Sequence, residues 1–452
     1  MYLVQSKALL NALFLLLAVF TAVLISNLGP TISLAITLTG VIFVISFAST
    51  EMALYLLIFS MLLSPEFGSR GTTGGGATIR VDDFLLIIIG FSWLIRMAIY
   101  KELGLFLETK LNRPILYFVV VCFFATAIGM ISGRVAIVTG FLFVIKYIEY
   151  FVIYFMVTFY VKERKQVRNF LLAMFLTCIV VCLVAMWQIP MGERVTAPFE
   201  GKGGEPNTLG GYLVFILALT LGLLLQLPDN RRRLWLGGFC VVIFVPLLFT
   251  LSRSSWVALI PMYLIFIIAT HHRLALLMVL VVGVLAAPFL MPKSIKERIE
   301  YTFQNKKVVE WQEKIGDVTL DTSSSARIHD WREALRAFLK HPIFGYGITG
   351  WQFVDNQYIR TLVELGLLGL CAFLGLLYVI LKEVWHIYKN VRTPFARGLT
   401  LGLFAGTIAL MTHSFGTNTF IIVRIMEPYW FVMGMVLVLP LVEFNRNGAQ
   451  SA

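Results

Sequence analysis

One arginine stands between two apolar runs in the segment LFTLSRSSWVAL, residues 248–259. A charged side chain beside stretches suited to lipid is unfavourable unless it lines a cavity or holds a polar partner. Arginine is permanently charged, and its planar guanidinium can hold two phosphate oxygens at once. We therefore interpret Arg253 as a candidate phosphate ligand. The alternative interpretation is an arginine that extends toward the lipid headgroups.

Two further segments offer arginines of the same kind. The segment ERVTAPFEGKGGEPNTLGGYL (193–213) combines Arg194 and Asn207 with several glycines, which allow the backbone to approach a ligand closely. Arg327 stands at the start of an amphipathic pattern at 328–340. A solvated loop arginine and a helix-surface arginine are the respective alternatives. We take Arg194 and Arg327 as candidate anion ligands beside Arg253, and Asn207 as a candidate substrate ligand.

A group that can accept a proton is expected in the segment DNQYIRTLVELGLLGL, residues 355–370. Asp355, Asn356 and Gln357 stand at the mouth of an apolar helix whose first turns also carry Arg360 and Glu364, and polar residues there favour a lined cavity. Asp355 is the candidate general base, or else the N-cap of that helix. Asn356 is a candidate substrate ligand. The alternative bases are His329, His341 and Glu364.

Charged residues also occur inside apolar stretches. Lys146 and Glu149 are one helical turn apart and are expected to pair. Arg424 and Glu427 have the same spacing; Arg424 is a further candidate phosphate ligand, and His413 a candidate substrate contact whose alternative is packing. The five cysteines have no histidines at metal-ligand spacing, so neither a metal site nor disulfides are expected.

The composition places these residues in a membrane protein. Of 452 residues, 59% are hydrophobic and 14% are charged, and the mean hydropathy is +0.85, values typical of polytopic membrane proteins. Apolar stretches of about 20 residues without strand-like alternation predict membrane-spanning helices. The first is interpreted as an uncleaved span. We expect an all-α polytopic fold with about twelve to fourteen spans, at 8–28, 31–49, 51–64, 82–100, 114–132, 138–161, 168–189, 208–227, 235–251, 254–270, 274–291, 357–382, 397–414 and 419–441.

The basic loops give an orientation and a domain division. The loops 101–113, 162–168, 228–233, 271–273 and 383–396 are rich in lysine and arginine and fall on one side, which predicts that this side and both termini are cytoplasmic. The opposite side receives 65–81, 190–207, 251–254 and a long loop. We divide the chain into N-terminal transmembrane helices (1–291), an extracytoplasmic loop (292–356), and C-terminal transmembrane helices with a short tail (357–452).

The long loop is expected to contain amphipathic helices. In IHDWREALRAFLK (328–340), Ile328, Trp331, Leu335 and Phe338 share one face, so this helix should lie on the membrane surface or roof a cavity. TSSS (322–325) offers N-caps, and residues 316–326 are interpreted as mobile. Lysines and glutamates alternate from KSIKERIE to EWQEK, which is typical of a solvated helix face.

Four stretches together resemble a known family. They are residues 193–213, LSRSSWVAL (251–259), RIHDWREALRAFLKHPIFGYG (327–347) and residues 355–370. In their order and spacing they resemble the O-antigen ligase and O-antigen polymerase superfamily of multi-span membrane glycosyltransferases, over roughly residues 110–440. The resemblance implies an inverting enzyme without metal or nucleotide sugar. It would act on glycans linked to undecaprenyl pyrophosphate at the outer face of the bacterial inner membrane, with Arg194, Arg253 and Arg327 holding the pyrophosphate.

One residue departs from the ligase pattern. Ligases usually carry a histidine where this sequence has Asp355, and the DNQYIRTL form is more similar to polymerases of O-antigen and exopolysaccharide repeats. The leading hypothesis is therefore a polymerase, and a ligase that passes the glycan to lipid A-core or protein is the second. A lipid-linked glycan transporter is the third, although no internal repeat supports it. The expected partners are the lipid-linked donor and acceptor, the bilayer and a separate chain-length regulator, with no nucleic acid and no cofactor.

Overall fold

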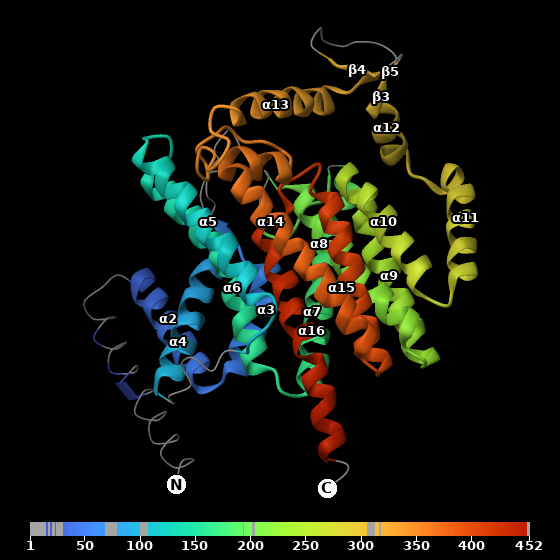
Figure 1. The fold of residues 1–452 in the computed structure, drawn as a ribbon. Coiled ribbons are helices and arrows are strands. Elements are labelled where there is room, and N and C mark those ends of the chain that lie inside the picture. The colour runs from blue at the N-terminus through green and yellow to red at the C-terminus, as the bar shows by residue number, and fades with distance from the viewer. Residues whose placement is uncertain are drawn as a thin grey trace.

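A computed structural model describes residues 15–16, 19, 23, 30–67, 79–99, 107–192, 194–200, 204–304, 312–315 and 318–449. The fold is all-α and polytopic, as predicted, with long helices running between two ends of a bundle (Figure 1). In chain order the helices of its first half are α2 (Pro30–Ala48), α3 (Thr50–Leu63), α4 (Val81–Ile99), α5 (Asn112–Ile131), α6 (Ile137–Tyr160), α7 (Arg164–Gln188) and α8 (Pro206–Gln226). Those of its second half are α9 (Asn230–Phe249), α10 (Arg253–Ala269), α11 (Arg273–Leu290), α12 (Lys293–Thr302), α13 (Thr322–Phe338), α14 (Gln357–Asn390), α15 (Pro394–His413) and α16 (Val423–Ala449).

The predicted spans agree with these helices to within a few residues at most ends, although α14 and α16 each extend eight residues beyond their predicted ends. Within the described ranges, eight helices are long and apolar enough to cross a membrane: Asn112–Ile131, Ile137–Tyr160, Arg164–Met191, Pro206–Gln226, Asn230–Phe249, Gln357–Asn390, Pro394–His413 and Val423–Glu443. Ile36–Ala48, Thr50–Leu63, Arg253–Ala269 and Arg273–Ala287 are shorter apolar helices. The predicted first span, 8–28, lies almost entirely outside the described residues.

The core of the bundle is formed by α8, α15 and α16. A carbon placed at the Cβ position of Gly222 in α8 would lie 2.3 Å from the carbonyl oxygen of Gly398 in α15 and 2.7 Å from the nitrogen of Gly402. The two backbones are therefore in direct contact. Small residues allow this approach in membranes, where helices associate through close packing rather than through hydrophobic burial.

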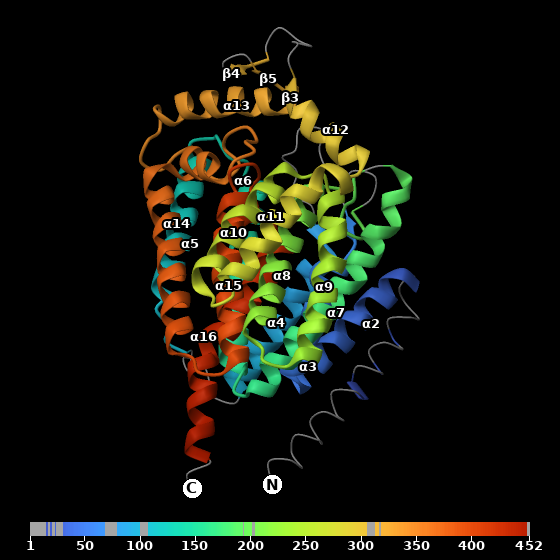
Figure 2. The same cartoon turned by 90° about the vertical axis from the view of Figure 1, so that its right-hand side faces the viewer.

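The helix ends group as the loop charges predict. At one end, Lys110 before α5 pairs with Glu383 near the end of α14 (2.9 Å), and Glu443 in α16 accepts from the backbone of Arg392 and Thr393 before α15. At the other end, α12 and α13 lie above the bundle, far from the C-terminus (Figures 1 and 2). The long loop and the basic loops thus occupy opposite ends of the molecule.

The long loop differs from the prediction in its middle. Three short strands, β3 (Phe303–Gln304), β4 (Lys314–Ile315) and β5 (Val318–Leu320), form an antiparallel sheet of order β3-β5-β4. The described part of 316–326 is regular structure, namely β5 followed by the first turn of α13. The N-cap of α13 is Asp321, whose side chain accepts from Ser323 N and Ser324 N, and not a residue of TSSS. Because the Asp321 carboxylate accepts these hydrogen bonds, α13 starts at Thr322, earlier than the apolar pattern at 328–340 indicates.

The segment after α13 fills a break in α14. Gly366 has φ 70° and ψ −169° inside α14, and around it the backbone nitrogens of Tyr346 and Gly347 donate to the carbonyl oxygens of Val363 and Glu364. A Cβ at Gly366 would lie 2.2 Å from the carbonyl oxygen of Ile343. Only glycine combines this backbone conformation with so close a contact. The break joins the first turns of α14 to the loop beneath α13.

Candidate functional site

The guanidinium of Arg253 lies at the N-terminal end of α10, against the start of α13. Ser252 caps α10, so Arg253 is its first residue. Arg253 Nη1 and Nη2 both donate to the carboxylate of Asp321, and Nη2 also donates to the Ser323 hydroxyl. The Arg253 side chain is 17% exposed and that of Asp321 is fully buried. Arg253, the predicted phosphate ligand, therefore forms a bidentate pair with a carboxylate. Arginine binds phosphate in the same bidentate arrangement.

Four arginines from four separate segments gather at this place. Burial, together with the charges of Arg298, Arg253 and Arg327, lowers the pKa of Arg194 to about 10. Burial and the charge of Arg253 likewise lower the pKa of Arg298 in α12. Like charges are held this close only where an anion or a rigid scaffold offsets their repulsion. The site is electropositive and suited to a highly charged anion.

Sequence reasoning missed Arg298 and Asp321. Arg298 was interpreted as part of a solvated helix face because glutamates alternate with basic residues around it. The pattern favours the serines after Asp321, and not Asp321 itself, as the N-caps of the amphipathic helix. An aspartate immediately before TSSS is itself an N-cap pattern, and that signal could have placed it at the start of α13.

Arg327 and Asp355 form the second ion pair under α13. Arg327 Nη2 donates to Asp355 Oδ2 at 3.2 Å, and both side chains are about one quarter exposed. Asp355 therefore lies at the arginine cluster and not at the helix cap. The N-cap of α14 is Asn356, whose Oδ1 accepts from Tyr358 N and Ile359 N and whose amide donates to Phe415 O. The Asn356 side chain thus bonds to the backbone at the start of α14 and after α15.

A chain of hydrogen bonds runs inward beside Arg253. The Ser252 hydroxyl donates to Asn207 Oδ1 (2.7 Å), the Ser255 hydroxyl donates to Ser252 Oγ (2.8 Å), and His413 Nε2 lies 3.1 Å from Ser255 Oγ. His413 Nδ1 is 2.8 Å from the Thr419 hydroxyl, and the ring is fully buried. Asn207 is half-buried at the site, whereas His413 lies at the inner end of the chain and supports it from below.

Arg194 joins its loop to the turn before Arg253. Its Nε donates to the carbonyl oxygen of Thr250 (3.0 Å) and its Nη2 to that of Leu251 (3.4 Å). The same turn is joined through Val195 N, which donates to Phe249 O. Arg194 is therefore close to the other arginines of the cluster, but two of its donors bond to the backbone that carries Arg253.

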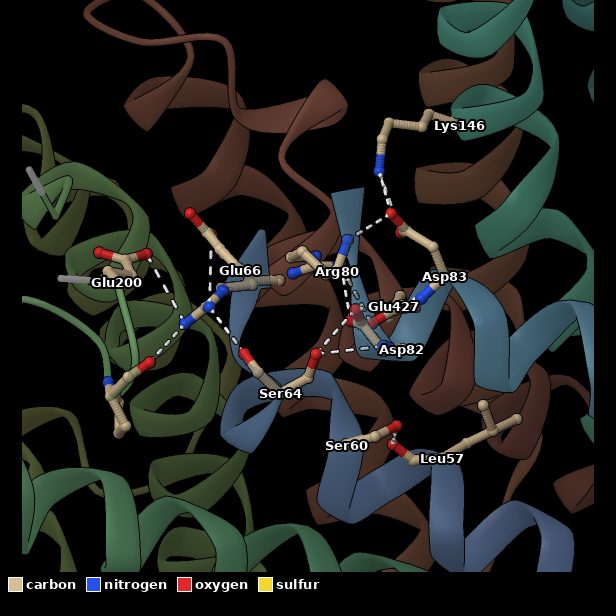
Figure 3. A network of polar contacts seen from close by, with 12 residues as sticks. Leu57, Ser60, Ser64, Glu66, Arg80, Asp82, Asp83, Lys146, Glu200 and Glu427 are labelled. Carbon is tan, nitrogen blue, oxygen red and sulfur yellow. Dashed lines mark hydrogen bonds and ion pairs between the residues drawn. The ribbon is translucent and has the colours of Figure 1, made fainter. Parts of the chain in front are cut away.

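Arg424 faces a different set of groups, among them Ser64, Glu66 and Glu200, which are labelled in Figure 3. It is 2% exposed, and it donates to the carbonyl oxygens of Pro198 (3.0 Å) and Ser64 (3.1 Å). It also forms ion pairs with Glu66 (3.3 Å) and Glu200 (3.7 Å). These oxygens belong to the chain itself, so Arg424 anchors two outer loops.

The two pairings predicted inside apolar stretches are corrected. Lys146 donates to both carboxylate oxygens of Asp83 at 3.0 Å, and Glu427 lies 3.8 Å from Arg80. Residues three apart on one helix can meet, but here Lys146 and Glu427 face partners brought in by α4 and β2 (Ile79–Arg80). Arg424 faces Glu66 and Glu200 instead. Helix spacing alone could not reveal these partners.

The alternative bases are placed differently from Asp355. Glu364 is buried, pairs with Arg360 at 3.1 Å and accepts from Thr349 N at 3.0 Å, so it holds the loop beneath α13. His329 is exposed on α13, and His341 packs edge-on against Tyr346. Among the predicted bases, Asp355 is the one paired with an arginine of the cluster.

One family model and one known protein sequence are similar to this chain. A family model described as O-Antigen ligase matches residues 241–374, a range that contains Arg253, Arg298, Asp321, Arg327 and Asp355. A protein of Haemophilus influenzae described as uncharacterized is 25% identical over 264 residues, which cover 52% of this chain and 63%, less than two thirds, of that protein. The family match confirms the resemblance to the O-antigen ligase and polymerase superfamily. The chain is a multi-pass membrane protein similar to a family of membrane glycosyltransferases.

Proposed function

We propose that the protein transfers a glycan from a polyprenyl pyrophosphate to a sugar hydroxyl at the outer face of the bacterial inner membrane. The observation that carries this proposal is the gathering of Arg194, Arg253, Arg298 and Arg327 under α13. A pyrophosphate that leaves a sugar gathers negative charge in the transition state. Preorganised cations in a site sheltered from water stabilise that charge, by a factor of about 10² to 10³ in rate for one donor.

The chemistry needs one proton acceptor besides the arginines. The acceptor hydroxyl oxygen forms a bond to the anomeric carbon from the face opposite the pyrophosphate, which inverts that centre. The carbon–oxygen bond to the pyrophosphate breaks, and its electron pair leaves with the lipid pyrophosphate. Asp355 takes the hydroxyl proton. The ion pair of Asp355 with Arg327 supports a base at the arginine cluster. In the proposed geometry this base faces the acceptor hydroxyl, on the side of the anomeric carbon opposite the pyrophosphate.

Polymerisation of lipid-linked repeats into O-antigen or exopolysaccharide is the preferred form of this reaction. Asp355 stands where ligases of the resembling family usually carry histidine, and this departure supports a polymerase. The ligase remains the second candidate, since the matching family is described as O-Antigen ligase. The two differ only in the acceptor. In either case the partners would be the lipid-linked donor, the bilayer and, for chain length, a separate membrane protein.

A reconstituted transfer assay tests the proposal. Purified protein in liposomes receives an undecaprenyl-pyrophosphate-linked repeat, with and without lipid A-core, and the products are separated on a gel. A polymerase gives a ladder on the polyprenyl lipid, and a ligase gives a shift only when lipid A-core is present. Arg253→Ala should lower the rate by about 10² to 10³. Arg232→Ala is the matched control, because Arg232 is an exposed arginine at the opposite end of the bundle.

Two outcomes would contradict the proposal. Full activity of Arg253→Ala would remove the arginine cluster from the reaction. Absence of any multi-repeat or transferred product, together with movement of the lipid-linked repeat across the liposome bilayer, would make the protein a transporter.

A further inference from the structure

A second group of charges lies among β2, α4, α6 and α16, and Figure 3 shows most of its members. Its members are two basic and four acidic side chains, here called the acidic cluster: Arg80, Asp82, Asp83, Lys146, Glu149 and Glu427. Asp82 and Glu427 are fully buried, Arg80 is 3% exposed and Glu149 is 8% exposed. The reaction proposed above uses none of them.

The contacts within the acidic cluster leave some of its carboxylate oxygens without a hydrogen-bond partner. Arg80 Nη2 lies 2.6 Å from Asp82 Oδ2, and Lys146 holds Asp83 through both oxygens. Asp82 Oδ1 accepts from the Ser64 hydroxyl at 3.0 Å. Neither oxygen of Glu427 has a hydrogen-bond partner, and its nearest basic group is Arg80, 3.8 Å from Oε2. Glu149 Oε1 also lacks a hydrogen-bond partner.

The charges do not balance. Two bases face four acids, so the acidic cluster carries two excess negative charges if every acid is ionised. Arg424, the next basic group, is already matched by Glu66 and Glu200. A buried carboxylate without a hydrogen-bond donor is strongly unfavourable, and such groups are neutralised by binding a cation or a proton. Glu427 is the residue with the least compensation.

We propose that the acidic cluster is a proton-binding site and that Glu427 holds the proton as a neutral carboxylic acid at neutral pH. A proton fits better than a metal ion, because no group of three or more His, Cys, Asp or Glu side chains in the described ranges is placed to hold a metal. The neutral Glu427 gains an O–H that can be shared with an acidic neighbour; Asp82 is its strongest acidic neighbour electrostatically. The site can bind a second proton at Glu149.

The proton-binding site is connected to the loops of the arginine cluster. Glu427 and Arg424 are one turn apart on α16. Ser64 joins them, since its hydroxyl bonds to Asp82 and its carbonyl oxygen accepts from Arg424. Arg424 in turn holds Pro198, four residues after Arg194. The groups that face Glu427 are Arg80, Asp82, Asp83 and Glu149, so loss of its proton adds repulsion that only Arg80 opposes.

Infrared spectroscopy of the full-length protein in detergent tests the proposal. A protonated carboxyl gives a C=O stretching band distinct from that of a carboxylate. The wild-type protein at neutral pH should show this band, and ¹³C labelling of glutamate should shift it. Glu427→Gln should remove it. Glu383→Gln is the control, because Glu383 is ion-paired to Lys110 at the opposite end.

Thermal unfolding as a function of pH is the second measurement. The folded wild type binds a proton that the unfolded chain releases, so Tm should fall as the pH rises from about 6 to about 9. In Glu427→Gln this fall should be smaller, because glutamine is neutral at every pH. Absence of the band in the wild type would overturn the proposal. A band lost in Glu149→Gln but kept in Glu427→Gln would overturn its assignment to Glu427. A rise of Tm at alkaline pH with sodium but not with choline would replace the proton by a metal cation.

Discussion

Arg194 bonds to a backbone carbonyl of a residue that is held in the left-handed conformation. Its Nη2 donates to Leu251 O, and Leu251 has φ 50°. Within the described ranges, two other non-glycine residues have positive φ: Phe199 (61°) and Thr349 (65°). Arg424 bonds to Pro198 and pairs with Glu200 on either side of Phe199, and Glu364 accepts from Thr349 N. Charged side chains thus fix each strained turn, and such strain is concentrated at functional sites.

A double-mutant cycle separates the two roles that Arg194 could have. If Arg194 acts mainly by holding the turn, Arg194→Ala should lose about tenfold less activity in a Leu251→Gly background, because glycine adopts the conformation without strain. If Arg194 acts mainly on the pyrophosphate, its loss should be the same in both backgrounds. Initial transfer rates of the four proteins give the answer.

Asp321→Asn tests whether the carboxylate competes with the donor for Arg253. Asparagine is as good an N-cap as aspartate, so α13 should keep its start. Its amide removes the negative charge that Arg253 holds, and the donor KM should fall by about tenfold, equivalent to about 1.4 kcal/mol. A KM that rises would instead mean that Asp321 orients Arg253 for substrate. Ser324→Ala, which affects the same turn without changing its charge, is the control.

Acid should weaken the attachment of α13. Hydrogen bonds from Arg253 and the turn of α13 outweigh the effect of burial and hold the pKa of Asp321 well below its usual range. A depressed pKa contributes stability at pH values above the ordinary aspartate value of about 3.9, and this stability is lost as the pH falls toward the folded value. Hydrogen exchange of α13 amides should therefore accelerate from pH 5 to pH 3 in the wild type, by about tenfold more than in Asp321→Asn after correction for intrinsic rates. Equal acceleration in both proteins would contradict the assignment.

Gly366→Ala should destabilise the protein, and Gly375→Ala should not. Both glycines lie in α14, but a Cβ at Gly366 meets a carbonyl oxygen in a left-handed turn, whereas a Cβ at Gly375 meets nothing within 4 Å. The expected loss for Gly366→Ala is about 1–3 kcal/mol. Gly375→Ala should be neutral or gain up to about 1 kcal/mol. Detergent-solubilised Tm values compare the two, and similar values would mean that the break in α14 is not required.

The sequence predicted the helices more fully than the site. Apolar length and loop charge were sufficient for the spans, because a membrane permits few alternatives for the backbone. They also placed Arg253 and Asp355 at the end of the bundle that carries the long loop. The ion pairs could not be predicted in this way: Asp321 is 68 residues from Arg253, and Asp83 is 63 residues from Lys146. Such partners are brought together by the packing of separate helices, which one sequence does not record. The strands β3–β5 were missed because each has only two or three residues.

The direct contact between α8 and α15 limits how the molecule can move. Gly222, Gly398 and Gly402 place one backbone against the other with no side chain between them. Helices joined in this way cannot slide past each other without first separating, and the seam runs through the middle of the bundle. A transporter that opened its centre to each side of the membrane in turn would have to break the contact between α8 and α15 in every transport cycle. In the proposed reaction, α8 and α15 would form a fixed base, and any adjustment would fall to the helices above it.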